Sequence, residues 1–239
     1  MSVTFSRLGH LGRMGNSMFQ IAAVIGYAEK HGQPFGFPAW EYQDYFANPL
    51  PSFPNEPVRV IQERSFSWHE PKAPFPHRNI DLYGYFQSEK YFKHAEATVR
   101  HYFKPKKEYE KSNFVSVHVR RGDYLGLSDY HNVLGMEYYN AACGMFSNCI
   151  FAVFSDDIPW CRENFKGDHF IFVDSGNDID DFFIMASCAH HIIANSSYSW
   201  WAAWLSEMDG KRVIAPKKWF GPAAPHNPKD IYCENFTVI

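Results

Sequence analysis

The sequence predicts an α/β protein made of two Rossmann-like domains that face a cleft. Three observations predict this class. Short apolar runs alternate with helical stretches through the second half, a strand, a glycine loop and a helix follow one another at the beginning, and a lysine-rich stretch at 104–107 separates the halves. Strands that alternate with helices in sequence form parallel sheets covered by helices. A chain of 239 residues suits two small domains.

The first domain is expected over residues 1–107. Prolines crowd 48–57 and 71–76, and because proline removes a backbone donor, both stretches are expected to be loops. The other predicted elements are a strand at 3–5, a helix at 16–30, a strand at 80–85 and a helix at 89–102.

The second domain is expected over residues 108–239. Residues 150–154 form a continuous apolar run, which is typical of a strand buried on both faces. Pro159 suits the first turn of the next helix, where its missing N–H costs little. The predicted strands are 114–119, 150–154, 169–173, 191–194 and 212–215, and the predicted helices are 135–147, one near Pro159, 180–188 and 197–207.

Composition excludes several classes of partner. The net charge of −3 argues against nucleic acid as a partner, although a local basic site is compatible with it. Aromatic residues make up 18% of the chain, and most of these rings are expected in the core. No stretch approaches the length of a membrane-spanning apolar helix, so no membrane span is expected and a cytoplasmic location is predicted. The 5 cysteines form no Cys-x-x-Cys pair, which favours reduced thiols.

The most informative segment is 117–124, which reads Val-His-Val-Arg-Arg-Gly-Asp-Tyr. Side chains alternate along a strand, so Val117 and Val119 fall on one face while His118 and Arg120 fall on the other. Ligands bind parallel sheets beyond the carboxyl ends of their strands, and an arginine guanidinium there fits phosphate oxygens in pairs. The segment therefore predicts a site for an anionic ligand, in which Arg121 is expected to form a structural ion pair.

Two strand–helix turns are further candidates. Asn16 follows the glycine loop of residues 12–15, and an ordinary βα turn is the alternative there. Asn195, Ser196 and Ser197 open a helix after an apolar strand, where hydroxyls and free N–H groups suit a diphosphate. Ordinary serine capping is the alternative.

Acidic residues at other strand ends are further candidates. Asp156 is favoured as a ligand for a base or ribose, with helix capping, suggested by the neighbouring Asp157, as the alternative. Asp174 and Ser175 are weaker candidates. Asp178 and Asp180 are expected to cap a helix, and no metal site is predicted because the histidines, including His190 and His191, lack metal-ligand spacing.

Four ordered blocks resemble the α-1,2-fucosyltransferases of glycosyltransferase family 11. They are His-x-Arg-Arg-Gly-Asp-Tyr at 118–124, the glycine loop at 12–19, Gly-Tyr-Phe-Gln-Ser-Glu-Lys-Tyr-Phe at 84–92 and Asn-Ser-Ser-Tyr-Ser-Trp-Trp at 195–201. The resemblance implies a glycosyltransferase B fold, GDP-fucose as donor, and inverting, metal-independent transfer to O2 of a terminal galactose in a glycan acceptor. It implies no cofactor.

The resemblance also implies roles for individual residues. Arg120 grips the diphosphate and His118 lies by the nucleotide, while Asn16 contacts the donor phosphate or sugar. Charge that develops on the diphosphate would be stabilised by Arg120 and by the helix that starts near Ser197. Asp123 is favoured as a residue that holds the loop. It is also the only carboxylate in the motifs that is proposed to take the acceptor proton, with a cleft residue that the sequence does not identify as the alternative base.

Because the sequence departs from the family pattern, the acceptor preference is the least transferable part of the resemblance. Arg13 and Ser17 stand where the family usually has glycine and glutamine, and the chain is shorter than most relatives between Gln33 and Asp81. Another nucleotide sugar, or a non-catalytic binding protein descended from such an enzyme, are the alternatives that the sequence leaves open.

Overall fold

The computed structural model describes residues 2–53, 58–71, 79–224 and 226–239, and the chain divides into two compact units. Unit 1 comprises Met1–Glu108 and Asn227–Cys233, and unit 2 comprises Tyr109–His226 and Glu234–Ile239. The sequence predicts a single crossing between 107 and 108. The chain instead returns to unit 1 near its end, which no sequence pattern indicated.

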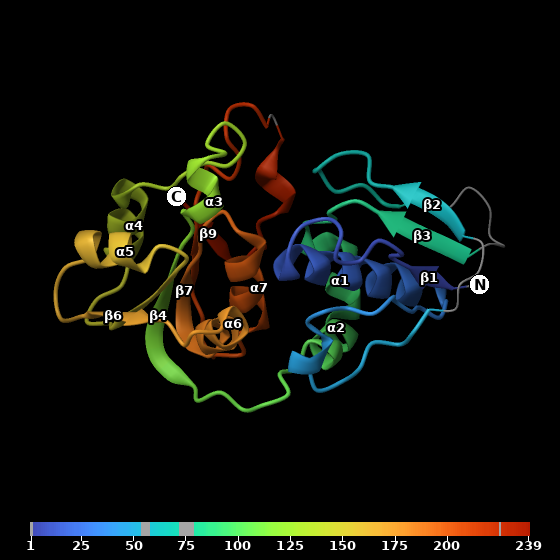
Figure 1. Cartoon of the computed structure of the whole chain (residues 1–239), viewed down its shortest axis with the longest axis horizontal. Coiled ribbons are helices and arrows are strands. Elements are labelled where there is room, and N and C mark those ends of the chain that lie inside the picture. Colours follow the sequence, from blue (N-terminus) through green and yellow to red (C-terminus); the bar gives the residue numbers. More distant parts are fainter. Residues whose placement is uncertain (1, 54–57, 72–78, 225) are drawn as a thin grey trace. The chain divides into compact units, whose positions relative to one another are not determined.

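Unit 1 contains a parallel sheet of three strands in the order β1-β3-β2, formed by β1 (Val3–Thr4), β3 (Asn79–Tyr83) and β2 (Val58–Gln62). The long helix α1 (Met14–His31) follows the glycine loop (Figure 1). Most of its residues are buried. The strand β2 was not predicted. It lies at the sheet edge, where Val60 is 53% exposed. Of the predicted loops, 54–57 and 72–76 lie outside the described residues.

The helix predicted at 89–102 is broken into three pieces. Two 3-10 turns, η2 (Glu89–Tyr91) and η3 (Lys93–Ala95), precede the α-helix α2 (Glu96–Tyr102). Phe92 lies between the turns with φ −141°, which interrupts the helical backbone, and its side chain is fully buried. The helix that the local sequence favours is therefore interrupted at the residue whose aromatic side chain packs in the core.

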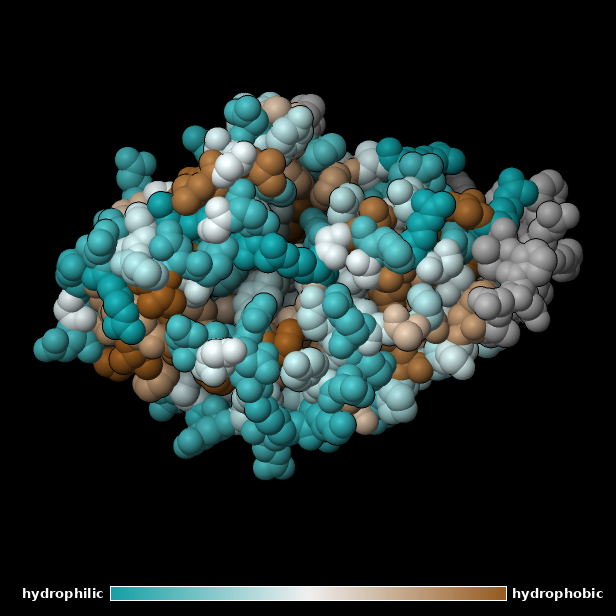
Figure 2. Space-filling model, in the orientation of Figure 1, coloured by the Kyte–Doolittle hydropathy of each residue, from teal (hydrophilic) through white to brown (hydrophobic). Residues whose placement is uncertain are grey.

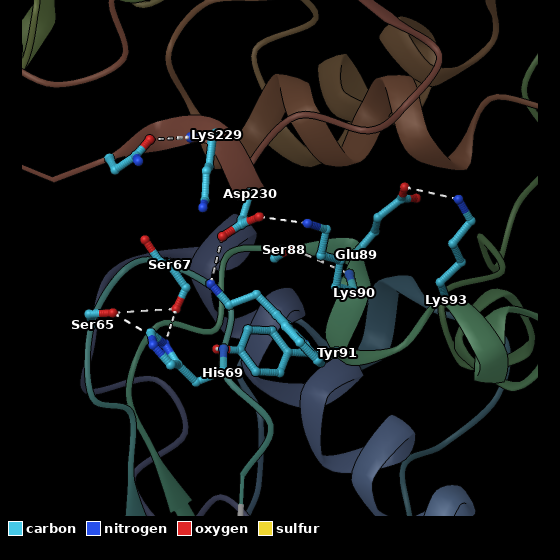
Figure 3. Close-up of polar contacts among 12 residues, drawn as sticks. Ser65, Ser67, His69, Ser88, Glu89, Lys90, Tyr91, Lys93, Lys229 and Asp230 are labelled. Atoms are coloured by element: carbon cyan, nitrogen blue, oxygen red, sulfur yellow. Dashed lines mark hydrogen bonds and ion pairs between the residues drawn. The ribbon is translucent and has the colours of Figure 1, made fainter.

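The returning segment is attached to unit 1 by Asp230, in the 3-10 turn η4 (Pro228–Asp230). Its Oδ1 lies 2.6 Å from Nζ of Lys90, and its Oδ2 accepts a hydrogen bond from the backbone N–H of Trp68 at 2.9 Å (Figure 3). Burial alone would raise the pKa of Asp230, but the bonds from Lys90 and Trp68 outweigh it and lower that pKa. Lys90, which lies in the block 84–92, thus forms an ion pair with Asp230 of the returning segment.

Unit 2 contains a parallel sheet of six strands in the order β6-β5-β4-β7-β8-β9. The chain runs outward from β4 through β5 to β6, and then crosses to β7 on the other side of β4. This reversal of direction is the topological switch point of a doubly wound sheet. The strands are β4 (Ser112–Val119), β5 (Phe151–Ser155), β6 (Phe170–Val173), β7 (Cys188–Ile192), β8 (Val213–Ala215) and β9 (Phe236–Val238), the last of which was not predicted.

Helices cover both faces of this sheet (Figure 1). Val115, Val117 and Val119 pack in one apolar cluster with Tyr139 and Cys161, which come from α4 and α5. Ser116 and His118 lie on the opposite face, where α6 and α7 pack against each other, so the predicted alternation of β4 is confirmed. The helices are α3 (Gly122–Leu125), α4 (Met136–Cys143), α5 (Ile158–Asn164), α6 (Asp178–Ala186) and α7 (Ser197–Leu205), and unit 1 adds the 3-10 turn η1 (Gln43–Tyr45).

The visible surface is mostly hydrophilic, with hydrophobic patches that include one over β6 and α5 (Figure 2). The strand β6 is an edge strand, and its Ile171 is 37% exposed. Among the described residues, no helix combines the length and the apolar character needed to cross a membrane. None of the five cysteines, all of which the structure describes, forms a disulfide bond.

Candidate functional site

A charged cluster of one arginine and two aspartates lies at the carboxyl end of β4. Nη2 of Arg120 lies 2.5 Å from Oδ1 of Asp123, and its Nη1 lies 2.7 Å from Oδ2 of Asp156, which follows β5. The cluster therefore lies beside the switch point between β4 and β7, where doubly wound sheets bind ligands. All three residues were singled out in the sequence, and the fold brings them together.

Asp156 is held from two sides. Its Oδ1 accepts a hydrogen bond from the backbone N–H of Arg121 at 2.9 Å, while its Oδ2 faces Arg120. A Cβ atom at Gly122 would lie 2.6 Å from that Oδ2, closer than real Cβ contacts. Glycine at position 122 thus leaves the space that the Asp156 carboxylate occupies.

Arg121 has different partners from Arg120. Its Nε lies 3.0 Å from Oδ2 of Asp157, and its guanidinium carbon lies 4.0 Å from the ring centre of Trp160. Asp157 also accepts a hydrogen bond from the N–H of Trp160 at 3.2 Å as the N-cap of α5, with Pro159 in the first turn. The ion pair predicted for Arg121 and the capping role indicated for Asp157 are both confirmed.

His118 is almost fully buried between β4 and α7. Its Nδ1 lies 2.8 Å from Oγ of Ser199, and its ring centre lies 5.3 Å from that of Tyr198. Burial, reinforced by the positive charge of Arg120, lowers the pKa of His118 to about 3. The imidazole is therefore neutral at neutral pH and offers a ligand a hydrogen bond without a charge.

Asn195 ties loop segments to the end of β7. Its Nδ2 donates to the carbonyl oxygens of Asn132 at 2.9 Å and Trp219 at 2.8 Å, and its own carbonyl accepts from the hydroxyl of Tyr124 at 3.1 Å. Its Oδ1 is buried and has no hydrogen-bond partner in the described part of the chain. Both amide hydrogens thus hold protein carbonyls, and a contact between Asn195 and a ligand remains a prediction.

Ser196 and Ser197 begin α7. Ser196 is the N-cap, and its Oγ accepts a hydrogen bond from the N–H of Tyr198 at 3.4 Å, so the capping alternative holds for this serine. Ser197 is the first residue of the helix, whose nine residues give its first turn a partial positive charge. This charge lies at the same edge of the sheet as Arg120, while ligand contacts by either serine remain predictions.

Asn16 belongs to unit 1 and lies in the first turn of α1. Its Oδ1 accepts a hydrogen bond from Nε2 of Gln87 at 2.8 Å, so the glycine loop and the block 84–92 meet at this side chain. Gly12 has φ +87°, and a Cβ there would lie 2.0 Å from Nδ2 of Asn16. Both the backbone conformation and the space beside Asn16 therefore require glycine at position 12.

The remaining acidic and histidine candidates have structural partners. Asp178 and Asp180 lie in the first turn of α6, where acidic charge favours the helix dipole, but the cap itself is Asn177, whose side chain accepts a hydrogen bond from the N–H of Ile179. Oδ1 of Asp174 accepts a hydrogen bond from the N–H of Gly176 at 3.3 Å, within the turn after β6. Over the ranges that the structure describes, no group of three or more histidine, cysteine or acidic side chains is arranged for a metal ion.

Three residues beside the site were not singled out in the sequence. Ser199 holds His118, and Tyr124 stacks on His131 with ring centres 4.3 Å apart. The guanidinium carbon of Arg120 lies 5.4 Å from the ring centre of Tyr124. Tyr124 and Ser199 lie within the blocks 118–124 and 195–201, whereas His131 lies in none of the blocks, and the contacts of all three arise from packing.

Unit 1 contains a cavity of about 210 Å³ beside β2. Glu63 lines it, and its Oε2 and Oε1 accept hydrogen bonds from the N–H groups of Tyr85 at 2.7 Å and Phe86 at 3.0 Å. Burial raises the pKa of Glu63. Phe86 has φ +51°, an uncommon conformation for a residue with a side chain. The other lining residues are Arg59, Val60, Ile61, Gln62, Arg64, His69, Glu70, Pro71 and Tyr91.

The fold is similar to that of a glycosyltransferase of the B type. A solved structure of a mutant of Arabidopsis thaliana FUT1 in complex with GDP matches the fold with a TM-score of 0.53 at 10% identity, over 90% of this chain and 70% of that one. The family model described as glycosyl transferase family 11 matches residues 33–239. The chain therefore belongs to glycosyltransferase family 11.

Relatives within the family differ in what they transfer. An alpha-1,2-colitosyltransferase of Escherichia coli is 30% identical over 92% of this chain and 93% of its own length. The O-antigen biosynthesis glycosyltransferase WbnK of Escherichia coli is 38% identical over 46% of this chain and 40% of its own. Galactoside alpha-(1,2)-fucosyltransferase 2 of Pongo pygmaeus is 28% identical over 83% of this chain and 68% of its own.

Proposed function

We propose that this chain transfers L-fucose from GDP-fucose to O2 of a terminal galactose in a glycan, with inversion, to form an α-1,2 linkage. The observation that carries the proposal is the position of Arg120 at the switch point of the unit 2 sheet, on the same edge as the first turn of α7. A guanidinium and a helix N-terminus together suit a diphosphate. The relatives named as fucosyltransferases support the choice of sugar.

Arg120 would act on the leaving group. The acceptor oxygen attacks the anomeric carbon, the bond from that carbon to the phosphate oxygen breaks, and the electron pair leaves on GDP. The guanidinium and the N–H groups of the first turn of α7 stabilise the negative charge that develops on the diphosphate. Because these fixed positive groups take the role that a metal ion has in other enzymes, no metal is required in this proposal.

Asp123 would take the proton of the acceptor hydroxyl. Its side chain is 43% exposed, against 25% for Asp156, which the N–H of Arg121 also holds. A bound diphosphate competes with Asp123 for Nη2 of Arg120, because it carries more negative charge than one carboxylate. Donor binding would thus release a carboxylate beside the reacting atoms, as general-base catalysis requires.

The test is release of GDP from GDP-fucose in EDTA, measured with and without a β-galactoside such as lactose or N-acetyllactosamine. Acceptor-dependent release, followed by assignment of the product linkage as α-1,2, would support the proposal. Tight binding of GDP-fucose without release with any galactoside would favour the non-catalytic alternative. If GDP-fucose neither binds nor reacts, the choice of donor is wrong.

Colitose is the second candidate sugar, because the alpha-1,2-colitosyltransferase of Escherichia coli aligns with nearly the whole chain. Colitose is L-fucose without its 3-hydroxyl group. A site that hydrogen-bonds this hydroxyl rejects the sugar that lacks it by about 10⁴-fold, whereas an apolar pocket discriminates far less. The ratio of kcat/KM for GDP-fucose to that for GDP-colitose therefore decides between the two donors.

A further inference from the structure

Ser199 is buried behind His118 and contacts no predicted ligand. Its Oγ lies 2.8 Å from Nδ1 of His118 and 3.4 Å from the carbonyl oxygen of Ser196, one helical turn earlier. Ser199 is fully buried, and His118 is 6% exposed. The three groups form a short chain from the backbone of α7 to the imidazole at the end of β4.

The number of hydrogens that these hydrogen-bonded groups share sets the tautomer of the His118 imidazole. The Ser199 hydroxyl has one hydrogen, and a hydroxyl that donates to the Ser196 carbonyl can only accept from His118. Nδ1 of His118 then carries the hydrogen. Because the imidazole is neutral, its Nε2 keeps a lone pair and acts as a hydrogen-bond acceptor.

We propose that Ser199 is a positioning residue that holds His118 in the Nδ1–H tautomer, so that Nε2 accepts a hydrogen bond from an N–H or O–H group of the nucleotide. The nucleotide part of this inference rests on the proposed function, whereas the tautomer does not. Either the guanine edge or the ribose hydroxyls of GDP can supply the donating group. An opposite tautomer would present an N–H at Nε2 and suit phosphate oxygens instead.

The first experiment reads the tautomer without a ligand. Nitrogen-15 NMR of the imidazoles, with His118→Gln to assign the signals, distinguishes a protonated Nδ1 from a protonated Nε2. We expect the hydrogen on Nδ1 in the native protein and a mixture of both tautomers in Ser199→Ala. A native signal with the hydrogen on Nε2 would overturn the proposal, whatever the donor sugar proves to be.

The second experiment measures GDP affinity by calorimetry, with a matched control from the same sheet. Ser116→Ala removes the equivalent hydroxyl from His191, whose Nδ1 lies 2.8 Å from Oγ of Ser116. We expect Ser199→Ala to weaken GDP about tenfold, Ser199→Thr to restore most of that loss, and Ser116→Ala to leave affinity unchanged. Equal losses in Ser199→Ala and Ser116→Ala would contradict a positioning role.

Analogues identify the group that donates to Nε2. Loss of discrimination between GDP and 2′-deoxy-GDP in Ser199→Ala assigns the ribose, whereas loss of discrimination between GDP and IDP, which lacks the guanine amino group, assigns the base. If Ser199→Ala preserves both preferences, His118 accepts a hydrogen bond neither from the 2′-hydroxyl nor from the guanine amino group, which overturns an assignment to those two groups. Failure of the native protein to bind any of these nucleotides counts against the proposed function and leaves the tautomer measurement valid.

Discussion

Two serine–histidine pairs lie on the same face of the unit 2 sheet and differ mainly in position. Ser116 and His191 pair at 2.8 Å in the interior, where both side chains are almost completely buried. His118 and Ser199 pair at the same distance at the carboxyl end of β4. Burial lowers the pKa of both histidines. Local chemistry is thus nearly identical in the two pairs.

The two pairs differ in the surroundings of Nε2, the second nitrogen of each imidazole ring. Nε2 of His191 is buried without a hydrogen-bond partner among the described residues, which costs stability. His118 lies two residues before Arg120, beside the switch point where ligands bind. The comparison teaches that position in the sheet, and not the pair itself, separates the interior contact from the one that the proposed function places beside a ligand.

The largest effect is expected from Arg120→Ala, which removes the only charge that the proposal places on the diphosphate. We expect kcat/KM to fall about 10³-fold, or about 4 kcal/mol of transition-state stabilisation. The kcat/KM of Arg120→Lys should lie between those of the native protein and Arg120→Ala, because a lysine keeps the charge but cannot bind two phosphate oxygens in parallel. The measurement is initial-rate kinetics of GDP release.

The control for Arg120 is its neighbour. Arg121→Lys weakens the contacts with Asp157 and Trp160, so it should lower the melting temperature while kcat/KM stays within about threefold of the native value. A larger loss of kcat/KM at position 121 than at position 120 would show that Arg121, and not Arg120, binds the diphosphate.

Acid is expected to destabilise the fold through both pairs. The folded protein holds His118 and His191 neutral, whereas the unfolded chain takes up a proton at each below pH 6.5, so protons favour unfolding. The loss begins as pH falls through 6.5 and continues toward the lower folded-state pKa values. At pH 5 it amounts to about 2 kcal/mol for His118, since each pH unit contributes about 1.4 kcal/mol, and His191 adds a loss in the same direction. Urea unfolding at pH 7.5 and pH 5 measures it.

Gly122→Ala tests whether the cluster of Arg120, Asp123 and Asp156 needs the space that glycine leaves for the Asp156 carboxylate. The new Cβ would displace the Asp156 carboxylate, which in turn positions Arg120, so we expect kcat/KM to fall about tenfold. Gly126→Ala is the matched control, because a Cβ there meets only the carbonyl oxygen of Asp123 at 3.8 Å, an ordinary contact. Equal activity in both variants would show that Asp156 does not position Arg120.

The smallest effect is expected from the double variant Ser116→Ala, His191→Phe. Removing both polar partners leaves no unpaired group in the interior, so the free energy of unfolding at pH 7.5 should change by less than about 1 kcal/mol. The variant should also lose the part of the acid sensitivity that His191 contributes, because one of the two neutral histidines is gone. An unchanged difference between pH 7.5 and pH 5 would assign the acid sensitivity to other groups.

Local patterns determined much of the molecule. The alternation of valines with Ser116 and His118 places β4, the apolar run at 150–154 places β5, and Pro159 marks the first turn of α5, because periodicity and turn chemistry act over a few residues. The strand-end positions of Arg120 and Asp156 followed from the same patterns. The family followed from four ordered blocks and agrees with the match over residues 33–239.

Tertiary structure alone decided the features that join distant segments. The edge strands β2 and β9, the return of Asn227–Cys233 to unit 1 and the pairing of Arg120 with Asp156 depend on neighbours far away in sequence. Ser199 has the same status, since 81 residues separate it from His118 and only the packing of α7 on β4 joins them. Such contacts leave no periodic trace in the chain, because their geometry is set by the packing of whole elements.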